Sequence, residues 1–296
     1  MSLTSNHGGV NPATATSRVL ERARAAAAAE LDHLSLGDHH STGHDAYVQN
    51  VPMIGRIMAD WPADRSIGLL LLLPLWNPVL AAEQVGTLAA MSEAPFVVQT
   101  GIGHGREQFE AMGIEYRRRG HVTDAAIGTM KRLFAGERVD AGEFGVRQAA
   151  INPRPPVEVE WWIGSGTGEV PLDRAARTGD AWYVSPGLPL PALKEAIGRY
   201  REKCAHHRTQ PRVALRRDVF VADDDSQGQA VGRAVAERGY RGIAEDVMVV
   251  GGVGRVADHF QALADVGVDD IVARTITVEQ AAAVRSIELL GAVREQ

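Results

Sequence analysis

The chain has 296 residues, of which 45% are hydrophobic and 23% charged, and its net charge is −6 at neutral pH. This composition excludes a largely disordered chain, and the negative charge argues against a nucleic-acid partner, because phosphate backbones are held by clustered lysines and arginines. Cys204 is the only cysteine, so no intrachain disulfide can form and we expect a cytoplasmic protein.

The predicted elements alternate between helices and strands. A weak strand at residues 2–6 precedes a first helix, for which Thr16 or Ser17 is the expected N-cap. The short apolar stretch 33–37 follows as a strand. Further strands are predicted at residues 65–73, 95–103, 157–164, 180–186, 212–222 and 268–275. Further helices are predicted at residues 77–92, 123–137, 171–180, 190–207 and 278–295.

Some stretches need a separate interpretation. Segments 104–121 and 138–156 are irregular, and the second contains Asp140-Ala141-Gly142, which is typical of a hairpin turn. The longest apolar run, residues 67–76, is shorter than the roughly 20 residues that span a bilayer, and Pro74 interrupts it. We therefore predict a buried strand there and no membrane partner.

The order of these elements predicts an α/β fold. Strands that read as continuous apolar runs are typical of buried parallel sheets, and repeated βα units form either a doubly wound sheet or an eight-stranded barrel. The strands show no split into two halves, which favours a (β/α)8 TIM barrel with insertions in its βα loops. We expect one domain over residues 1–296.

In such a barrel the reactive groups lie at the carboxyl ends of the strands. The segments that follow predicted strands are 38–40, 74–77, 101–105 and 164–168. Trp76 is the best aromatic candidate for lining a pocket there. Trp161 and Trp162 are adjacent on one strand and are expected in the core, because neighbouring strand residues face opposite sides.

The sequence GSGTG at residues 164–168 precedes a predicted helix. Glycines let backbone N–H groups approach a ligand, the hydroxyls of Ser165 and Thr167 add donors, and a helix N-terminus favours negative charge. A phosphate-bearing cofactor fits this pattern, whereas the alternative is a flexible turn. The sequence GIGHG at 101–105 lacks the spacing of the dinucleotide fingerprint.

The sequence GDHHSTGHD, residues 37–45, allows three interpretations. His40 and His44 are candidate metal ligands, but no further ligand cluster completes a set and we predict no metal. The segment is alternatively a polar loop without a role. We favour a neutral histidine at the rim that titrates near pH 6.5 and moves protons or stabilises an anionic intermediate.

Four segments in order resemble the luciferase-like flavin- and deazaflavin-dependent oxidoreductases. GDHH after the second strand is similar to the family's E/D-H-H, and GIGHGREQFEAMGIEYRRRG (101–120) to its glycine- and arginine-containing segment. VEWWIGSGTGEVPLDRAARTGDAWY (159–183) and GRVADHFQALADVGVDDIV (254–272) are similar to two later family segments. The resemblance runs nearly end to end.

This resemblance implies an oligomeric barrel, expected to be a homo-oligomer, that binds FMN or the deazaflavin coenzyme F420 at its rim. It implies that residues 164–167 hold the phosphate end, that His39 matches the histidine near the flavin ring, and that His40 supports it. The expected catalytic residues are therefore His39 and His40. The expected cofactor-binding residues are Asn6, Leu70, Gly101, Gly103, His104, Gly164, Ser165, Gly166 and Thr167. The expected substrate-side residues are His44, Trp76 and Glu107.

Two departures leave the cofactor open. His104 stands where some members have an arginine for the flavin phosphate, and no tryptophan follows the histidine pair as in several deazaflavin reductases. The leading prediction is an oxidoreductase, a monooxygenase that uses reduced FMN and oxygen on a small organic substrate, with the FMN reduced by a separate flavin reductase. The alternatives are an F420-dependent dehydrogenase or reductase and a non-catalytic, flavin-binding or structural subunit.

Overall fold

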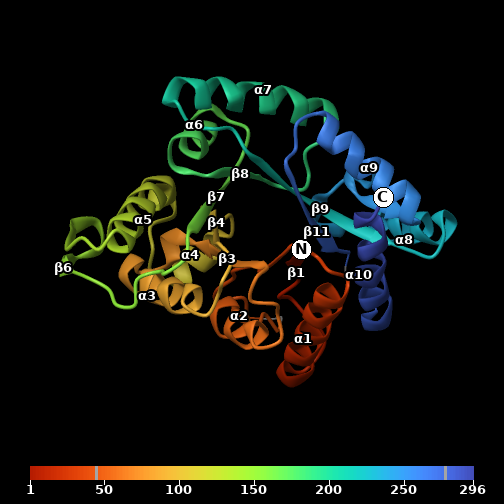
Figure 1. Ribbon diagram of the computed structural model, residues 1–296, viewed down its shortest axis with the longest axis horizontal. Coiled ribbons are helices and arrows are strands. Elements are labelled where there is room, and N and C mark those ends of the chain that lie inside the picture. The colour runs from red at the N-terminus through yellow and green to blue at the C-terminus, as the bar shows by residue number, and fades with distance from the viewer. Residues whose placement is uncertain (44–45, 277–278) are drawn as a thin grey trace.

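The computed structural model describes residues 1–43, 46–276 and 279–296. In this part of the chain eight parallel strands alternate with helices and form a nearly closed barrel, which confirms the predicted α/β barrel over the doubly wound alternative. Figure 1 shows the helices arranged around the central strands. The barrel strands are β1 (Ser2–Leu3), β2 (His33–Leu36), β3 (Ser66–Leu72), β4 (Phe96–Gly101), β7 (Val159–Ser165), β8 (Ala181–Val184), β9 (Val213–Val221) and β11 (Asp270–Thr275).

The helices lie outside the strands (Figure 1). They are α1 (Pro12–Ala28), α2 (Asn50–Met58), α3 (Pro78–Ala89), α4 (Arg106–Ala111), α5 (Arg119–Phe134), α6 (Glu169–Thr178), α7 (Leu190–His207), α8 (Asp225–Glu237), α9 (Val253–Asp265) and α10 (Gln280–Arg294). Within the described ranges, none of the helices combines the length and apolar character needed to cross a membrane.

The strand order explains where the barrel is open. Hydrogen bonds link β1, β2, β3, β4, β7, β8 and β9 in that order, and β11 pairs with β9. Strand β1 packs beside β11, but the described residues form no ladder between them. An additional strand, β10 (Val249–Gly251), pairs with the carboxyl end of β9.

Side chains alternate between two apolar layers. In β7 the side chain of Trp161 packs in the main core, whereas Trp162 lies in a second cluster with Val97, Tyr183 and Val272. Both tryptophans are only 3% exposed, which confirms the prediction that they are core residues. The second cluster fills the inside of the barrel. Its side chains therefore lie beneath any site at the carboxyl ends of the strands.

The predictions of the first helix cap and of the short helices agreed less well with the structure than the prediction of the barrel. The first helix starts at Pro12 and is capped by Asn11, whose side chain accepts the Thr14 N–H, so the expected cap at Thr16 or Ser17 was wrong. Helices α2 and α4 were not predicted, since both are short. The predicted hairpin is present, since β5 (Val139–Ala141) and β6 (Val146–Ala149) pair antiparallel, but its turn starts at Gly142 and the predicted turn residues Asp140 and Ala141 belong to β5.

Candidate functional site

Residues 37–43, which we call the histidine loop, lie directly after β2, at the carboxyl end of the barrel. Asp38 is 2% exposed, and its Oδ2 accepts the Leu72 N–H at 2.8 Å and the Trp76 Nε1–H at 2.8 Å. Its Oδ1 lies 3.1 Å from His40 Nε2. One buried carboxylate therefore joins the end of β3, the Trp76 indole and the His40 ring. The structure places Trp76 and His40 together, with their ring centroids 5.5 Å apart.

His40 is also linked to the segment after β4. Its backbone N–H donates to Gln108 Oε1 at 3.1 Å, and Gln108 belongs to α4. This contact connects two rim segments that are far apart in the sequence.

His39 has different neighbours. Its ring lies edge-on to Tyr47, with centroids 4.6 Å apart, and its carbonyl accepts the Gln49 side-chain amide at 2.9 Å. Burial, and then the nearby Arg274 guanidinium, lower the pKa of His39 to about 4. His39 is therefore neutral at physiological pH, as predicted, but the expectation that it titrates near pH 6.5 was wrong, because the site disfavours its protonated form.

Charged residues that the sequence analysis did not single out lie at the same mouth. We call Arg216, Arg241, Arg274 and Asp218 the interior arginine cluster. Arg216 Nε and Arg241 Nη1 lie 3.3 and 3.4 Å from the two oxygens of Asp218, whose side chain is fully buried. Arg274 stands opposite Asp218 in the β11–β9 register and donates to Thr4 Oγ1 at 2.7 Å.

A signal for this cluster was present in the sequence. Arg216 and Asp218 are two residues apart in β9, on the face that also presents Ala214 to the barrel interior. Charged residues on the inward face of a barrel strand are costly to bury, and they therefore mark a candidate functional site.

Some of the residues predicted to bind the cofactor lie close together at the ends of β3 and β4. The Leu70 side chain packs between the inner barrel cluster and a cluster that contains Leu72 and Phe109. A side chain at Gly101 would meet Leu72 and Leu70, and Gly103 adopts a φ of +73° against Phe109. These glycines let the chain turn closely over the end of β3.

His104 and Glu107 lie further out. Both residues are exposed, and Glu107 stands in the first turn of α4. The carbonyl of His104 accepts the Tyr116 hydroxyl at 3.2 Å. The described contacts do not join either side chain to His39 or His40.

The turn 164–168 connects β7 to α6, next to the end of β4. A Cβ atom at Gly164 would lie 2.0 Å from the Thr100 carbonyl oxygen, whereas a Cβ atom at Gly166 would meet nothing within 4 Å. The N-cap Gly168 supplies no side-chain hydrogen bond to α6. The first-turn residue Glu169 is paired with Lys203 Nζ at 2.7 Å, which balances its charge. The turn therefore presents open space and uncapped backbone amides.

Asn6 and His44 are the remaining residues predicted at the site. Asn6 forms an antiparallel bridge with Tyr47, so it lies beside the residue that contacts His39. His44 lies outside the described residues. In the described ranges no group of three or more potential ligands could hold a metal ion.

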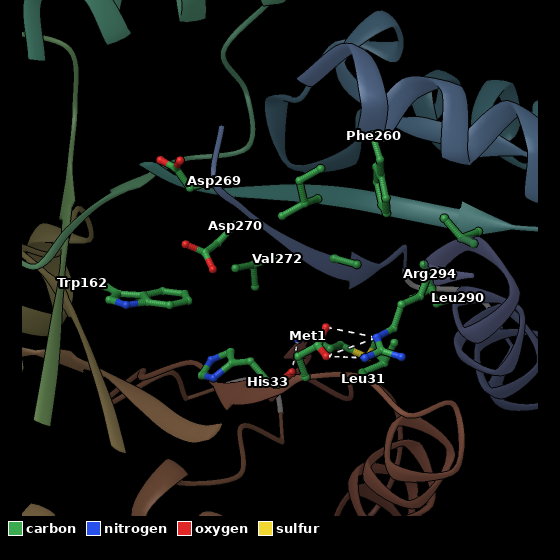
Figure 2. A pocket seen from close by; sticks show the side chains of 14 residues that line it. Met1, Leu31, His33, Trp162, Phe260, Asp269, Asp270, Val272, Leu290 and Arg294 are labelled. Carbon is green, nitrogen blue, oxygen red and sulfur yellow. Dashed lines mark hydrogen bonds and ion pairs between the residues drawn. The ribbon is translucent and has the colours of Figure 1, made fainter. Parts of the chain in front are cut away.

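A cavity of about 260 Å³ lies at the opposite end of the barrel. It is lined by the first residues of β2 and β11, His33 and Asp270, and by Trp162 (Figure 2). It adjoins the gap between β1 and β11. Because barrel enzymes carry their chemistry at the carboxyl ends of the strands, we place the candidate site at the mouth near His39.

The comparison with protein families agrees with this architecture. The profile of the family described as luciferase-like monooxygenase matches residues 1–287. The chain therefore belongs to the luciferase-like monooxygenase family.

Sequence relatives match only in part. The FMNH2-dependent dimethylsulfone monooxygenase of Pseudomonas fluorescens (strain Pf0-1) is 24% identical over 161 residues, which cover 53% of this chain and 44% of that enzyme. The matched segments span about half the length of the curated relatives.

Solved structures match over nearly the full length. The monooxygenase RslO1 from Streptomyces bottropensis superposes with a TM-score of 0.85 at 16% identity, covering 99% of this chain and 98% of that one. An F420-dependent secondary alcohol dehydrogenase, solved with an F420-acetone adduct, gives a TM-score of 0.78 at 15% identity, with 99% and 97% covered. At sequence identities this low, the structural similarity shows a shared fold only.

Proposed function

We propose that the protein is a flavin-dependent oxidoreductase, a monooxygenase that uses reduced FMN and oxygen on a small organic substrate. The observation that carries this proposal is the arrangement of the family's two motifs on one rim: the histidine loop follows β2 and the glycine turn follows β7. The name of the Pseudomonas relative, an FMNH2-dependent monooxygenase, supports reduced FMN as the cofactor.

The residues at the rim fit a flavin with a terminal phosphate. The open space at Gly166 and the amides before α6, which no side chain caps, suit a phosphate dianion. Ser165 and Thr167 add hydroxyl donors, and Gly101 and Gly103 allow close approach of the neighbouring loop. Asn6, Leu70 and His104 complete the proposed cofactor contacts.

The two histidines have separate roles in this proposal. Reduced FMN, when bound, supplies the electrons that activate oxygen. His39 stays neutral and offers one nitrogen donor and one acceptor to the reacting groups. Asp38 faces His40 Nε2, which suits the tautomer with its proton on Nε2 and leaves Nδ1 as the acceptor. His44, Trp76 and Glu107 are proposed on the substrate side; Trp76 contacts Asp38 and His40.

Titration of the purified protein with FMN, reduced FMN and F420 tests the cofactor. We expect selective binding of reduced FMN, followed by fluorescence or calorimetry. Selective F420 binding would favour the hydride-transferring alternative, which the alcohol dehydrogenase of the same fold represents. Absence of binding by all three would favour the non-catalytic subunit. A separate flavin reductase and a homo-oligomeric state belong to the same proposal.

Replacement of the histidines tests the chemistry. His39→Ala is expected to lower turnover by about 10²–10⁴-fold, the scale of a lost acid/base group, while the affinity for reduced FMN changes little. His40→Ala is also expected to lower turnover, because it removes the ring that lies between Asp38 and Trp76. The control is His206→Ala, because His206 is exposed on α7. Turnover unchanged in both rim variants would contradict the assignment.

A further inference from the structure

The cavity at the amino-terminal end of the barrel strands lies apart from the proposed flavin site. Strand β11 begins at this cavity with Asp270 and ends at the opposite mouth with Thr275. Among the described residues, the lining of the cavity includes no member of the histidine loop or of the glycine turn 164–168. Its volume of about 260 Å³ is just below the roughly 300–1,000 Å³ of common ligand pockets. The cavity therefore has the size for a small molecule.

Much of the cavity wall is apolar. Trp162 from β7 and Phe260 from α9 lie on different sides of it (Figure 2), and Val272 from β11 lies between them. Leu290 and Val293 from α10 complete this part of the wall. Transfer of an apolar ligand body from water to such a wall is favourable. The wall therefore suits a ring or a short aliphatic chain.

The carboxylates beside Trp162 outnumber their cation. Arg212 donates to both oxygens of Asp270, from Nε at 2.7 Å and from Nη2 at 3.0 Å. The same guanidinium donates from Nη1 to Glu160 Oε2 at 2.8 Å, and this oxygen also accepts the Trp162 indole N–H. Two carboxylates thus share one guanidinium group, which leaves one negative charge without a counter-ion.

The rim of the cavity adds a second negative charge. Asp32 is paired with Arg294 at 2.8 Å, so these two charges balance. Asp269 accepts the Val213 N–H at 2.8 Å but forms no ion pair within the described residues. The Met1 amino group also lies here, and burial lowers its pKa to about 5, so it is neutral at physiological pH. The surroundings of the cavity are therefore acidic overall.

His33 supplies an uncharged acceptor in the cavity lining. Its Nδ1 lies 3.0 Å from Ser66 Oγ, whereas its Nε2 is buried and lacks a hydrogen-bond partner in the described part of the chain. Burial lowers the pKa of His33 well below its ordinary value, so the ring is neutral. A neutral imidazole has one donor and one acceptor nitrogen. With Nδ1–H directed at Ser66, Nε2 is the acceptor, and it needs a donor from a ligand.

We propose that this cavity binds a small organic ammonium ion, a protonated primary amine with an apolar body about the size of one ring. The three N–H donors of the ammonium group match the acceptors of Asp269, Asp270 and His33. The apolar body extends along Val272 towards Phe260. A neutral ligand would leave the negative charge unbalanced, and an anion would be repelled. The amine site is separate from the flavin site and does not depend on the proposed function.

Benzylamine and benzyl alcohol test the charge preference. The two molecules have the same size and the same ring, but benzylamine is a cation at neutral pH. We expect calorimetry at constant ionic strength to show at least about tenfold tighter binding of benzylamine. Equal affinity for the two molecules, tighter binding of the alcohol or no binding of benzylamine would overturn the proposal.

Replacement of Asp270 tests the carboxylate. Asp270→Asn keeps the shape of the side chain and removes its charge, so we expect about tenfold weaker binding of benzylamine and nearly unchanged binding of benzyl alcohol. Asp223→Asn is the matched control, since Asp223 is 61% exposed and pairs with Arg285 on α10. Equal benzylamine affinity in Asp270→Asn and the unaltered protein would overturn the proposal.

A larger side chain in the cavity tests the position of the ligand. Ala273 lines the cavity and is 7% exposed, so the added carbons of Ala273→Leu take up space that the ligand needs. We expect the affinity for both probes to fall by about tenfold or more. Ala281→Leu is the control, because Ala281 is exposed on α10. Unchanged binding in Ala273→Leu would overturn the proposal, and this variant provides the test if Asp270→Asn does not fold.

Titration in the presence of reduced FMN separates the two proposed sites. We expect the same benzylamine affinity with and without saturating FMN, because the sites lie at opposite ends of the barrel. Loss of benzylamine binding in the presence of FMN would place the amine at the catalytic mouth and overturn the inference. A protein that binds benzylamine but no flavin would overturn the proposed function and leave the amine site standing.

Discussion

His39 and His40 are neighbours in the sequence but have different environments. The His40 Nε2 atom lies 3.1 Å from the buried Asp38 carboxylate, which orients the ring. The His39 ring lies against Tyr47 and within the influence of Arg274, which disfavours a positive charge. A single strand end thus presents one histidine oriented by a buried carboxylate and one suited to neutral hydrogen bonding.

Removal of the Arg274 charge is expected to change the titration of His39. In Arg274→Gln the pKa of His39 should rise from its value of about 4, because a nearby positive charge is removed. It should stay below 6.5, because burial is the larger cause of the lowering and remains. NMR titration of the histidine ring signals measures this shift. Arg285→Gln serves as the control, and an unchanged His39 pKa in Arg274→Gln would show that the two groups do not interact.

At the scale of elements, the contact between β4 and β7 controls the position of the glycine turn. The two strands pair in parallel from Phe96 to Thr100, and Gly164 lies against the Thr100 carbonyl just beyond the last pair. A side chain at this point would push the strands apart and move the amides before α6. Gly166, two residues later, is free of this restriction.

The pair Gly164→Ala and Gly166→Ala separates packing from binding. Gly164→Ala is expected to lower the free energy of unfolding by about 3 kcal/mol, because its Cβ would lie 2.0 Å from a backbone oxygen. Gly166→Ala should change stability by less than about 1 kcal/mol and act on FMN affinity instead. Urea unfolding and FMN titration of both variants provide the measurements. Equal loss of stability in the two would contradict the packing argument.

For the whole molecule, buried histidines link folding to pH. His7 is 6% exposed, and burial together with nearby Arg22 lowers its pKa to about 4. The pKa of the partly exposed His39 is also about 4. In the unfolded chain both titrate near 6.5, so below that pH the unfolded state binds more protons than the folded state and stability falls.

The expected stability profile follows from this difference. The free energy of unfolding should decrease between pH 6.5 and about 4 as the two histidines become protonated in the unfolded chain. His7 contributes up to about 1.4 kcal/mol per pH unit, and the more exposed His39 contributes less. Urea unfolding from pH 8 to pH 5 measures the slope, and His7→Gln should reduce it. The same slope in both proteins would show that His7 is not responsible.

Local patterns in the sequence determined the architecture. Continuous apolar runs such as residues 67–73 identify buried parallel strands, and their regular alternation with helices identifies the barrel, since both signals depend on residues close together in the chain. The strand-end positions of His39, Trp76 and Gly164–Thr167 followed from the same pattern. Short elements such as α4, with six residues, carry too few periods to be recognised.

Only the tertiary structure decided which of these groups act together. The pairing of Asp38 with Trp76, and the convergence of Arg216 and Arg274 from β9 and β11, join residues that are tens of positions apart. The lowered pKa of His39 likewise depends on burial and on an arginine more than 200 residues away in the sequence. Charge balance and desolvation are properties of a volume in space, and the order of residues along the chain does not contain them.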